Sequence, residues 1–205
     1  MTKLGLAINT GRCIGCHTCA NACKMQNNVP MGMLWNRVLT EGCEVIDGAL
    51  GDYPNLSRTY LPVACQHCEN PACLRVCPTG ATYKDTLGRV EVDYEKCIGC
   101  RMCMAACPYN ARVFNWSDPK REPDFNYGDA DVPVRTKGVA EKCTLCKERT
   151  DRGDEPMCVA CCPTSARIFG DLDDPESEIS VVLRERNATV LLEEQGTRPQ
   201  VHYFN

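Results

Sequence analysis

Most cysteines of this 205-residue chain fall into four sets whose spacing is suited to holding iron-sulfur clusters. The first and third sets have the spacing C-x2-C-x2-C-x3-C, and the other two are looser versions, C-x2-C-x4-C-x3-C and C-x2-C-x11-C-x3-C. Cysteines at every third residue of a tight loop present several thiolates on one side of the chain, as a [4Fe-4S] cubane requires. The sets therefore predict four [4Fe-4S] clusters and the transfer of single electrons.

Two other uses of thiols fit this spacing less well. With 18 cysteines the chain is rich enough for a disulfide scaffold, but neighbours at C-x2-C spacing are poorly placed to bridge distant segments. Zinc binds between two C-x2-C pairs separated by a loop, and only the set that begins at Cys143 resembles this arrangement. Four iron-sulfur clusters are favoured, with a mixture of cluster types as the main alternative.

The fourth cysteine of each set is expected to bind the cluster of a different set. In ferredoxins with two clusters, the last cysteine of each run ligates the neighbouring cluster and locks two half-motifs together. If the two middle sets pair with each other and the two outer sets pair around them, the second set pairs with the third and the first with the fourth. The predicted sites, which keep these names below, are site 1 (Cys13, Cys16, Cys19 and Cys162), site 2 (Cys143, Cys146, Cys158 and Cys23), site 3 (Cys65, Cys68, Cys73 and Cys107) and site 4 (Cys97, Cys100, Cys103 and Cys77).

This pairing predicts an α+β fold made of two ferredoxin-like halves with loop-rich inserts. The outer half would comprise residues 1–60 and 139–205, and the inner half residues 61–138 with an insert over 115–138. The apolar and alternating segments predict strands over 3–9, 59–64 and 200–204 and a hairpin over 81–92. A short helix is expected after each ligand loop, and a further helix over 176–186.

The remaining candidate ligands are interpreted as packing residues. The C-x3-C-P register favours Cys162 over its neighbour Cys161 as a ligand, and Cys43 has no companion. The three histidines, His17, His67 and His202, are not needed as ligands because each nearby set already has four sulfurs. The chain also contains no phosphate-binding, nucleophile or metalloprotease motif. We therefore expect it to be non-catalytic by itself and to serve a partner that carries the chemistry.

Charge and hydropathy exclude two further classes of function. The formal net charge is -4, and sixteen thiolates with four oxidised cubane cores of about +2 each would bring it to about -12. No basic run is present, so nucleic acid is an unsuitable partner. The first residues have neither an apolar signal core nor a twin-arginine pair, and no segment is long enough to span a membrane. We expect export bound to a partner that carries the signal and a peripheral place at the membrane, with the cytoplasm as the alternative.

The segments around the cysteines resemble a known family. The chain is similar to the four-cluster iron-sulfur electron-transfer subunits of molybdopterin oxidoreductases, the type found in dimethyl sulfoxide reductase and polysulfide reductase. The resemblance is carried by C-K-M-Q-N-N-V-P (23–30), D-Y-P-N-L (52–56), H-C-E-N-P (67–71), F-G-D-L-D-D-P-E-S (169–177) and E-Q-G-T-R-P (194–199). The insert over 115–139 is also similar to that of respiratory arsenate reductase small subunits.

The resemblance implies a relay of electrons through four [4Fe-4S] clusters during anaerobic respiration. The donor would be quinol-linked or soluble, and the acceptor a large catalytic subunit with a molybdenum or tungsten bis-pterin cofactor. Some members also dock on an integral membrane subunit that handles quinols. In this family site 1 lies nearest the catalytic subunit. The alternative function is an iron-sulfur redox sensor or scaffold that carries no turnover current.

Overall fold

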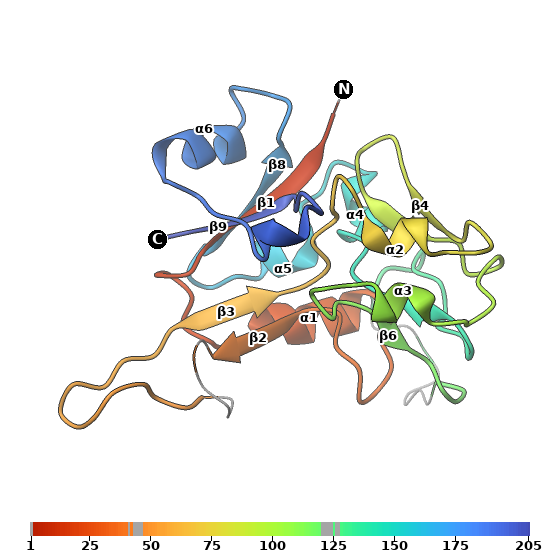
Figure 1. Cartoon of the computed structure of the whole chain (residues 1–205), viewed down its shortest axis with the longest axis horizontal. Coiled ribbons are helices and arrows are strands. Elements are labelled where there is room, and N and C mark those ends of the chain that lie inside the picture. Colours follow the sequence, from red (N-terminus) through yellow and green to blue (C-terminus); the bar gives the residue numbers. More distant parts are fainter. Residues whose placement is uncertain (1, 41, 43–46, 120–124, 126–127) are drawn as a thin grey trace.

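The computed structural model describes residues 2–40, 42, 47–119, 125 and 128–205. Cys43, which was predicted to be a packed thiol, lies outside these residues. Within them the chain forms short helices and small sheets (Figure 1). No helix in the described ranges is long and apolar enough to cross a bilayer.

The two ends of the chain meet in a three-stranded sheet. The central strand β1 (Leu4–Asn9) pairs antiparallel with β8 (Arg167–Asp171) and parallel with β9 (Val201–Phe204). Alternate residues of β1, together with Val201 and Tyr203, form a buried apolar cluster. Burial of these apolar side chains gives the sheet a conventional hydrophobic core on one face. Strands were predicted at both ends of the chain, and the structure places them side by side.

Helix α6 (Glu178–Glu185) packs against β8 and β1 of this sheet. The Ser177 side chain caps the helix by accepting a hydrogen bond from the Ser180 backbone N–H at 3.3 Å. Ile179, on the first turn, is fully buried and faces Gly170 of β8, where a Cβ would lie 2.9 Å from its Cγ2. The glycine therefore allows the close approach of helix and strand.

Three two-stranded sheets complete the strand structure. They are β2 (Arg37–Thr40) with β3 (Tyr60–Val63), β4 (Thr82–Lys84) with β5 (Val90–Val92), and β6 (Val113–Phe114) with β7 (Ala140–Glu141). The β4–β5 hairpin was predicted, and Asp85 closes its turn by accepting from the N–H groups of Leu87 and Arg89. Strand β2 was not predicted because only one of its four residues is both apolar and buried.

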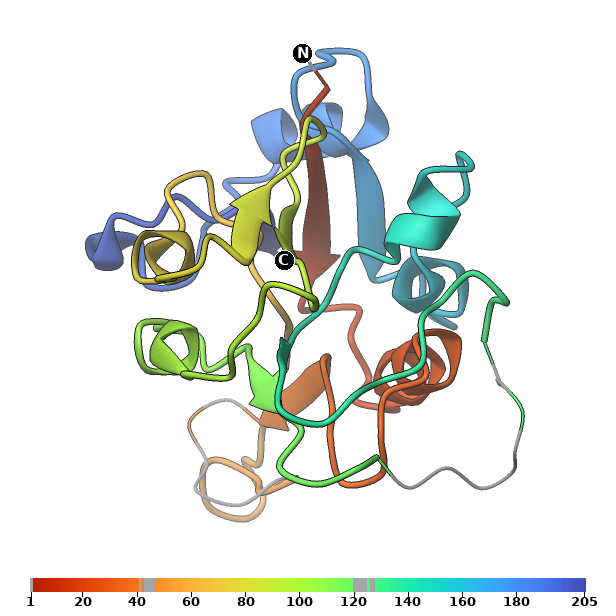
Figure 2. The same cartoon turned by 90° about the vertical axis from the view of Figure 1, so that its right-hand side faces the viewer.

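Most helices lie next to the ligand loops. Helix α1 (Thr18–Gln26) has nine residues, whereas α2 (Ala72–Arg75), α3 (Met102–Ala105), α4 (Lys147–Thr150) and α5 (Met157–Ala160) are single turns. The 3-10 turn η1 (Glu193–Gln195) lies near the end. Helix α1 packs against α5, and α2 packs against α3. Figure 2 shows these two pairs on opposite sides of the molecule. The pair α1–α5 joins the first and last cysteine sets, and α2–α3 joins the second and third.

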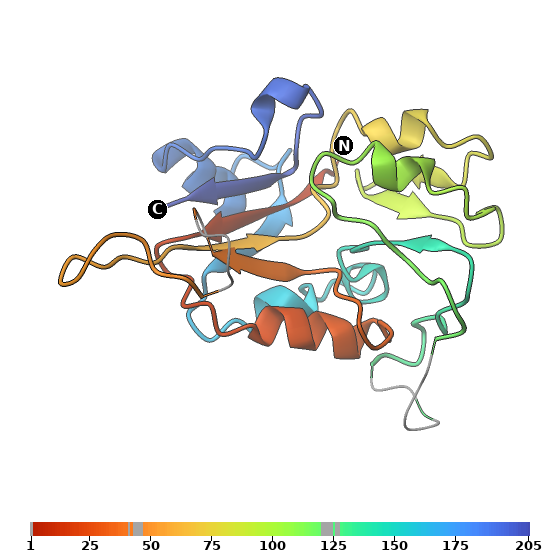
Figure 3. The same ribbon diagram turned by 60° about the horizontal axis from the view of Figure 1, so that its bottom comes forward.

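The sequence predicts two inserts, over 31–58 and 115–139, and these differ in how they relate to the rest of the chain. Residues 47–59, between β2 and β3, extend away from the body of the molecule (Figure 3). The second insert instead packs on the end of α1, where Arg135 Nε donates to the Asn27 carbonyl at 2.9 Å and Gln26 Nε2 donates to Asp129 at 3.0 Å. Pairs β2–β3 and β6–β7 each cross a predicted boundary between the halves, so the halves share hydrogen bonds.

Candidate iron-sulfur centres

Two of the ligand loops have the same unusual backbone. In the first set Gly15 and His17 have φ values of +68° and +56°, and in the third set Gly99 and Arg101 have +69° and +63°. Left-handed residues on either side of the second cysteine curl the loop tightly. The sequence repeat C-I-G-C thus produces a structural repeat that turns its sulfurs to one side.

The turn after the last cysteine of three sets supplies hydrogen bonds to sulfur. The third residue beyond that cysteine is left-handed in each case, namely Gly80, Asn110 and Ser165. In two of the turns a backbone N–H then donates to the sulfur, from Thr82 to Cys77 at 3.4 Å and from Ala166 to Cys162 at 3.3 Å.

These donors favour the thiolate over the thiol. Burial acts in the opposite direction, but the hydrogen bonds outweigh it and lower the pKa of Cys77 and of Cys162 below the ordinary value. A cluster ligand must be deprotonated, so this turn suits that role.

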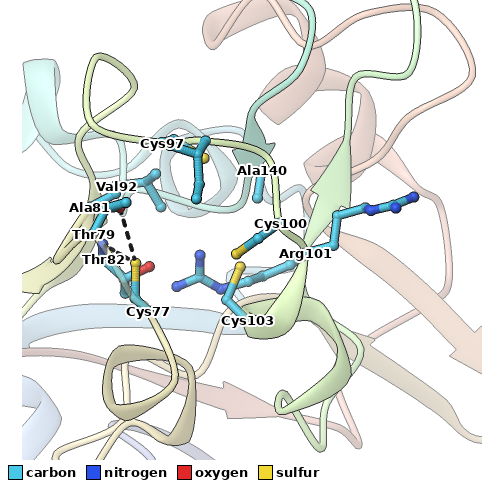
Figure 4. A pocket seen from close by; sticks show the side chains of 12 residues that line it. Cys77, Thr79, Ala81, Thr82, Val92, Cys97, Cys100, Arg101, Cys103 and Ala140 are labelled. Carbon is cyan, nitrogen blue, oxygen red and sulfur yellow. Dashed lines mark hydrogen bonds between the residues drawn. The ribbon is translucent and has the colours of Figure 1, made fainter.

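The sulfurs of site 4 surround one cavity. Cys77, Cys97, Cys100 and Cys103 line it together with Thr82 and Ala140 (Figure 4). The cysteines come from two sets, because Cys77 ends the second and the other three open the third.

Site 1 has the corresponding arrangement at the other end of the molecule. Cys13, Cys16, Cys19 and Cys162 line a second cavity, so here too the fourth cysteine comes from a distant set. Cys16 and Cys100, which occupy the same place in the two loops, are both exposed.

The structure also brings together the sulfurs of sites 2 and 3. All four cysteines of site 2 are buried, and after burial itself the other three are the strongest influences that raise the pKa of Cys23. In site 3, burial raises the pKa of Cys68 to about 12, with contributions from its three partner cysteines. Four buried thiolates so close together require a positive core to compensate their repulsion.

The four sites form a series in which site 1 lies next to site 2, site 2 next to site 3, and site 3 next to site 4. Beyond the effect of burial, Cys19 of site 1 raises the pKa of Cys158 in site 2. Cys65 of site 3 likewise raises the pKa of Cys143 in site 2, beyond the effect of burial, and the two side chains belong to one buried cluster. Helices α2 and α3 then bring Cys73 of site 3 to Cys103 of site 4.

The donor set fits a cluster better than a single ion. Among the described residues, no three His, Cys, Asp or Glu side chains converge closely enough to hold one metal ion. The sulfurs of sites 1 and 4 instead stand around a hollow, as the ligands of a cubane do.

The residues predicted to be packing groups have the following surroundings. Cys161 is half-buried beside Cys19 and Cys158, and burial raises its pKa to about 11. His67 is buried, and its Nδ1 accepts a hydrogen bond from the Val90 N–H at 3.1 Å. His17 opens α1 as a left-handed residue, and His202 lies half-buried in β9.

Sequence reasoning did not identify three buried cations beside the sites. Arg112, Lys142 and Arg167 are 3%, 1% and 5% exposed. The two arginines end the repeated string C-P-x-x-A-R, which was the available signal, but the repeat alone does not show where the side chains point. Lys142 directly precedes Cys143 and donates to its carbonyl at 2.7 Å.

Comparison with protein families agrees with this chemistry. A 4Fe-4S dicluster domain matches residues 56–122 and 131–172, and a 4Fe-4S binding domain matches residues 6–26. Together these matches include the segments that contain all four cysteine sets.

Whole-chain relatives are subunits of oxidoreductases. A Halobacterium salinarum protein described as a dimethyl sulfoxide reductase iron-sulfur subunit is 54% identical over 100% of this chain and 80% of its own length. The arsenate respiratory reductase iron-sulfur subunit ArrB of Shewanella sp. strain ANA-3 is 36% identical, over 98% of this chain and 96% of its own. A subunit of the sulfite dehydrogenase of Allochromatium vinosum is 39% identical, over 100% and 83%. The chain belongs to the family of dimethyl sulfoxide reductase iron-sulfur subunits, the 4Fe-4S electron-transfer subunits of molybdopterin reductases.

Proposed function

We propose that the chain holds four [4Fe-4S] clusters at sites 1 to 4, in two ferredoxin-like halves that each contain two sites. Sites 1 and 2 belong to the outer half, residues 1–60 and 139–205, and sites 3 and 4 to the inner half, residues 61–138. Each bound cluster accepts and releases one electron. The cavities lined by sites 1 and 4, and the close approach of the sulfurs in sites 2 and 3, support the crossed ligand sets.

The observation that carries the proposal is the linear order of the sites. Cys19 of site 1 and Cys158 of site 2 belong to one buried cluster, and so do Cys143 of site 2 and Cys65 of site 3. Sites 3 and 4 are adjoined through the packing of α2 against α3. The two terminal sites each expose a cysteine, whereas site 2 is buried throughout. Electrons would therefore enter at one end of the series and leave at the other.

The two ends of the series have matching docking surfaces. Ile14 and Ile98, in the two C-I-G-C loops, are 59% and 67% exposed although both are large and apolar. Apolar side chains beside an exposed ligand suit the centre of an interface, because they exclude water from the path of the electron. We assign the Ile14 surface to the catalytic subunit and the Ile98 surface to the second redox partner.

The proposed catalytic partner carries a molybdenum or tungsten bis-pterin cofactor. The relatives include subunits named for reductases and one named for a dehydrogenase, so one relay design serves different substrates in this family. We propose a quinol-linked or soluble redox partner at the other end, in some assemblies an integral membrane subunit. The complex would be exported as a whole and remain peripheral to the membrane.

Iron content tests the cofactor proposal. The protein isolated without oxygen should contain about 16 iron atoms per chain, four for each of four cubanes. A content near half of that, or zinc in place of iron, would refute the assignment of four clusters.

Two matched variants test the ends of the relay. Ile14→Glu should abolish copurification of the catalytic subunit, because a charge would be buried at the interface, and Ile98→Glu should leave it intact. Ile14 and Ile98 each line the cavity of the adjacent site, but both side chains are mostly exposed and neither is a ligand, so both variants should keep their full iron content. Equal retention or equal loss of the catalytic subunit in the two variants would contradict the assignment of the ends.

A further inference from the structure

We propose that Arg112 and Arg167 are positioning residues that raise the reduction potentials of the clusters, one arginine for each pair of sites. The inference rests on the proposed four-cluster function. It concerns the two junctions inside the halves, between sites 1 and 2 and between sites 3 and 4.

Arg167 lies at the junction of sites 1 and 2. Its Nη2 donates to the sulfur of Cys19, in site 1, at 3.4 Å and to Asn36 Oδ1 at 3.1 Å. Cys158, in site 2, also interacts with this guanidinium, which lowers the pKa of that cysteine against the effect of burial. Asn36 is itself buried and fixes the orientation of the arginine.

Arg112 lies at the junction of sites 3 and 4. It lines the cavity of site 4, although its chain segment follows Cys107, a cysteine of site 3. Within the described residues, neither Nη1 nor Nη2 has a partner of good hydrogen-bonding geometry. The groups that act on it are sulfurs on both sides of the junction, Cys73 in site 3 and Cys103 in site 4.

The sequence repeat explains why the two arginines occupy equivalent places. Each is the fifth residue after the last cysteine of its set, beyond a left-handed turn at Asn110 or Ser165. The second set has Thr82 at this place, and Thr82 lines the same cavity as Arg112. Each half thus has one guanidinium at its junction, which avoids the repulsion of two buried cations in one space.

A buried guanidinium is costly unless negative charge surrounds it. Arginine stays protonated at any physiological pH, so its charge is constant. When a cluster takes up one electron, the charge of its core falls by one unit and its attraction to the guanidinium grows. Because each arginine is shared by two sites, both potentials rise together, and the arginine does not widen the difference between them.

Neutral variants measure this effect directly. Arg112→Met should make reduction of two of the four clusters at least tenfold less favourable, a fall of at least about 59 mV in each midpoint potential for a one-electron couple. Arg167→Met should lower the midpoint potentials of the other two clusters by a similar amount. The readout is a potentiometric titration followed by electron paramagnetic resonance, on the full chain with its clusters assembled. The unaffected pair is the internal control in each variant.

The charge-conserving variants Arg112→Lys and Arg167→Lys separate charge from packing. The Lys variants should keep all four clusters. Their midpoint potentials should lie closer to those of the parent protein than the midpoint potentials of the Met variants do. If a Met variant loses iron, the corresponding Lys variant separates the two explanations. Retention of four clusters in the Lys variant supports a role for the positive charge. The same loss of iron in the Lys variant refutes that role. Four unshifted potentials in a fully loaded Met variant would also overturn the inference. Low iron in the parent would instead refute the proposed function.

Discussion

Substitution of Gly99, between Cys97 and Cys100, is a sharp test of how the backbone builds site 4. At its φ of +69° a side chain is disfavoured, and an added Cβ would lie 2.4 Å from the carbonyl oxygen of Gly138. That separation is far below the 3.0 Å that real Cβ atoms keep. The oxygen belongs to backbone held by the Gly138 N–H bond to the Asn115 carbonyl at 2.8 Å, so it cannot easily move aside.

Gly138 provides a matched control. Its φ is +83°, but a Cβ there would have nothing within 4 Å. Gly138→Ala therefore has only the left-handed conformational cost, about 1–2 kcal/mol. Gly99→Ala has this cost and also a steric overlap, for which over-packed sites lose a further amount of about 1–3 kcal/mol. For a chain of this size, each kcal/mol corresponds to a change of about 2–4 °C in Tm.

The expected difference shows in iron content and in thermal stability. Under oxygen-free conditions Gly138→Ala should lower Tm by about 2–8 °C and keep about 16 iron atoms. Gly99→Ala should lower Tm further and displace its two flanking cysteines, so that iron falls to about 12 per chain as site 4 is lost. Equal Tm values with full iron content in both variants would refute the steric reasoning.

Three further predictions concern stability and ligand choice. Ile179→Ala should lower the free energy of unfolding by about 2–5 kcal/mol in denaturant titrations and leave cluster spectra unchanged, because the fully buried side chain packs on Gly170 of β8 and lines neither cluster cavity. Burial raises the pKa of Glu91 to about 7, so the folded state binds a proton that the unfolded state has released, and stability should fall by about 3 kcal/mol as pH rises from about 4.5 to 7. Glu91→Gln should flatten this dependence in unfolding measured at a series of pH values, and an unchanged slope would contradict it. Cys161→Ala should keep the iron content of the parent whereas Cys162→Ala should lower it, and the reverse result would exchange their roles.

Local sequence signals predicted much of the backbone correctly. The strand near the start, the hairpin predicted over 81–92, the last strand and α6 all lie where alternation, turn residues and the helical pattern indicated. These elements depend on residues close together in the chain. Strand β2 escaped prediction because its short, partly polar segment becomes a strand only through the partner β3.

The two inserts also combine a feature that the sequence indicated with a contact that only the structure shows. Their composition marked them as departures from the repeat, and Figure 3 shows residues 47–59 extending from the body as an insert would. Nothing in the composition indicated that Arg135 would reach the end of α1 and lie 4.6 Å from the centre of the Trp35 ring. Such contacts depend on two segments far apart in the chain.

The amino-acid sequence by itself indicated the kind of cofactor, the family and the candidate ligands, because the spacing of cysteines along a loop limits which sulfurs can face one cluster. Only the tertiary structure decided which sites adjoin one another, which of them reach the surface, and that Arg112 and Arg167 lie between them. The physical reason is the separation along the chain of the residues that interact. A ligand loop is built by the left-handed turns of a few consecutive residues, whereas a junction between sites exists only when packing brings distant segments and their buried charges together.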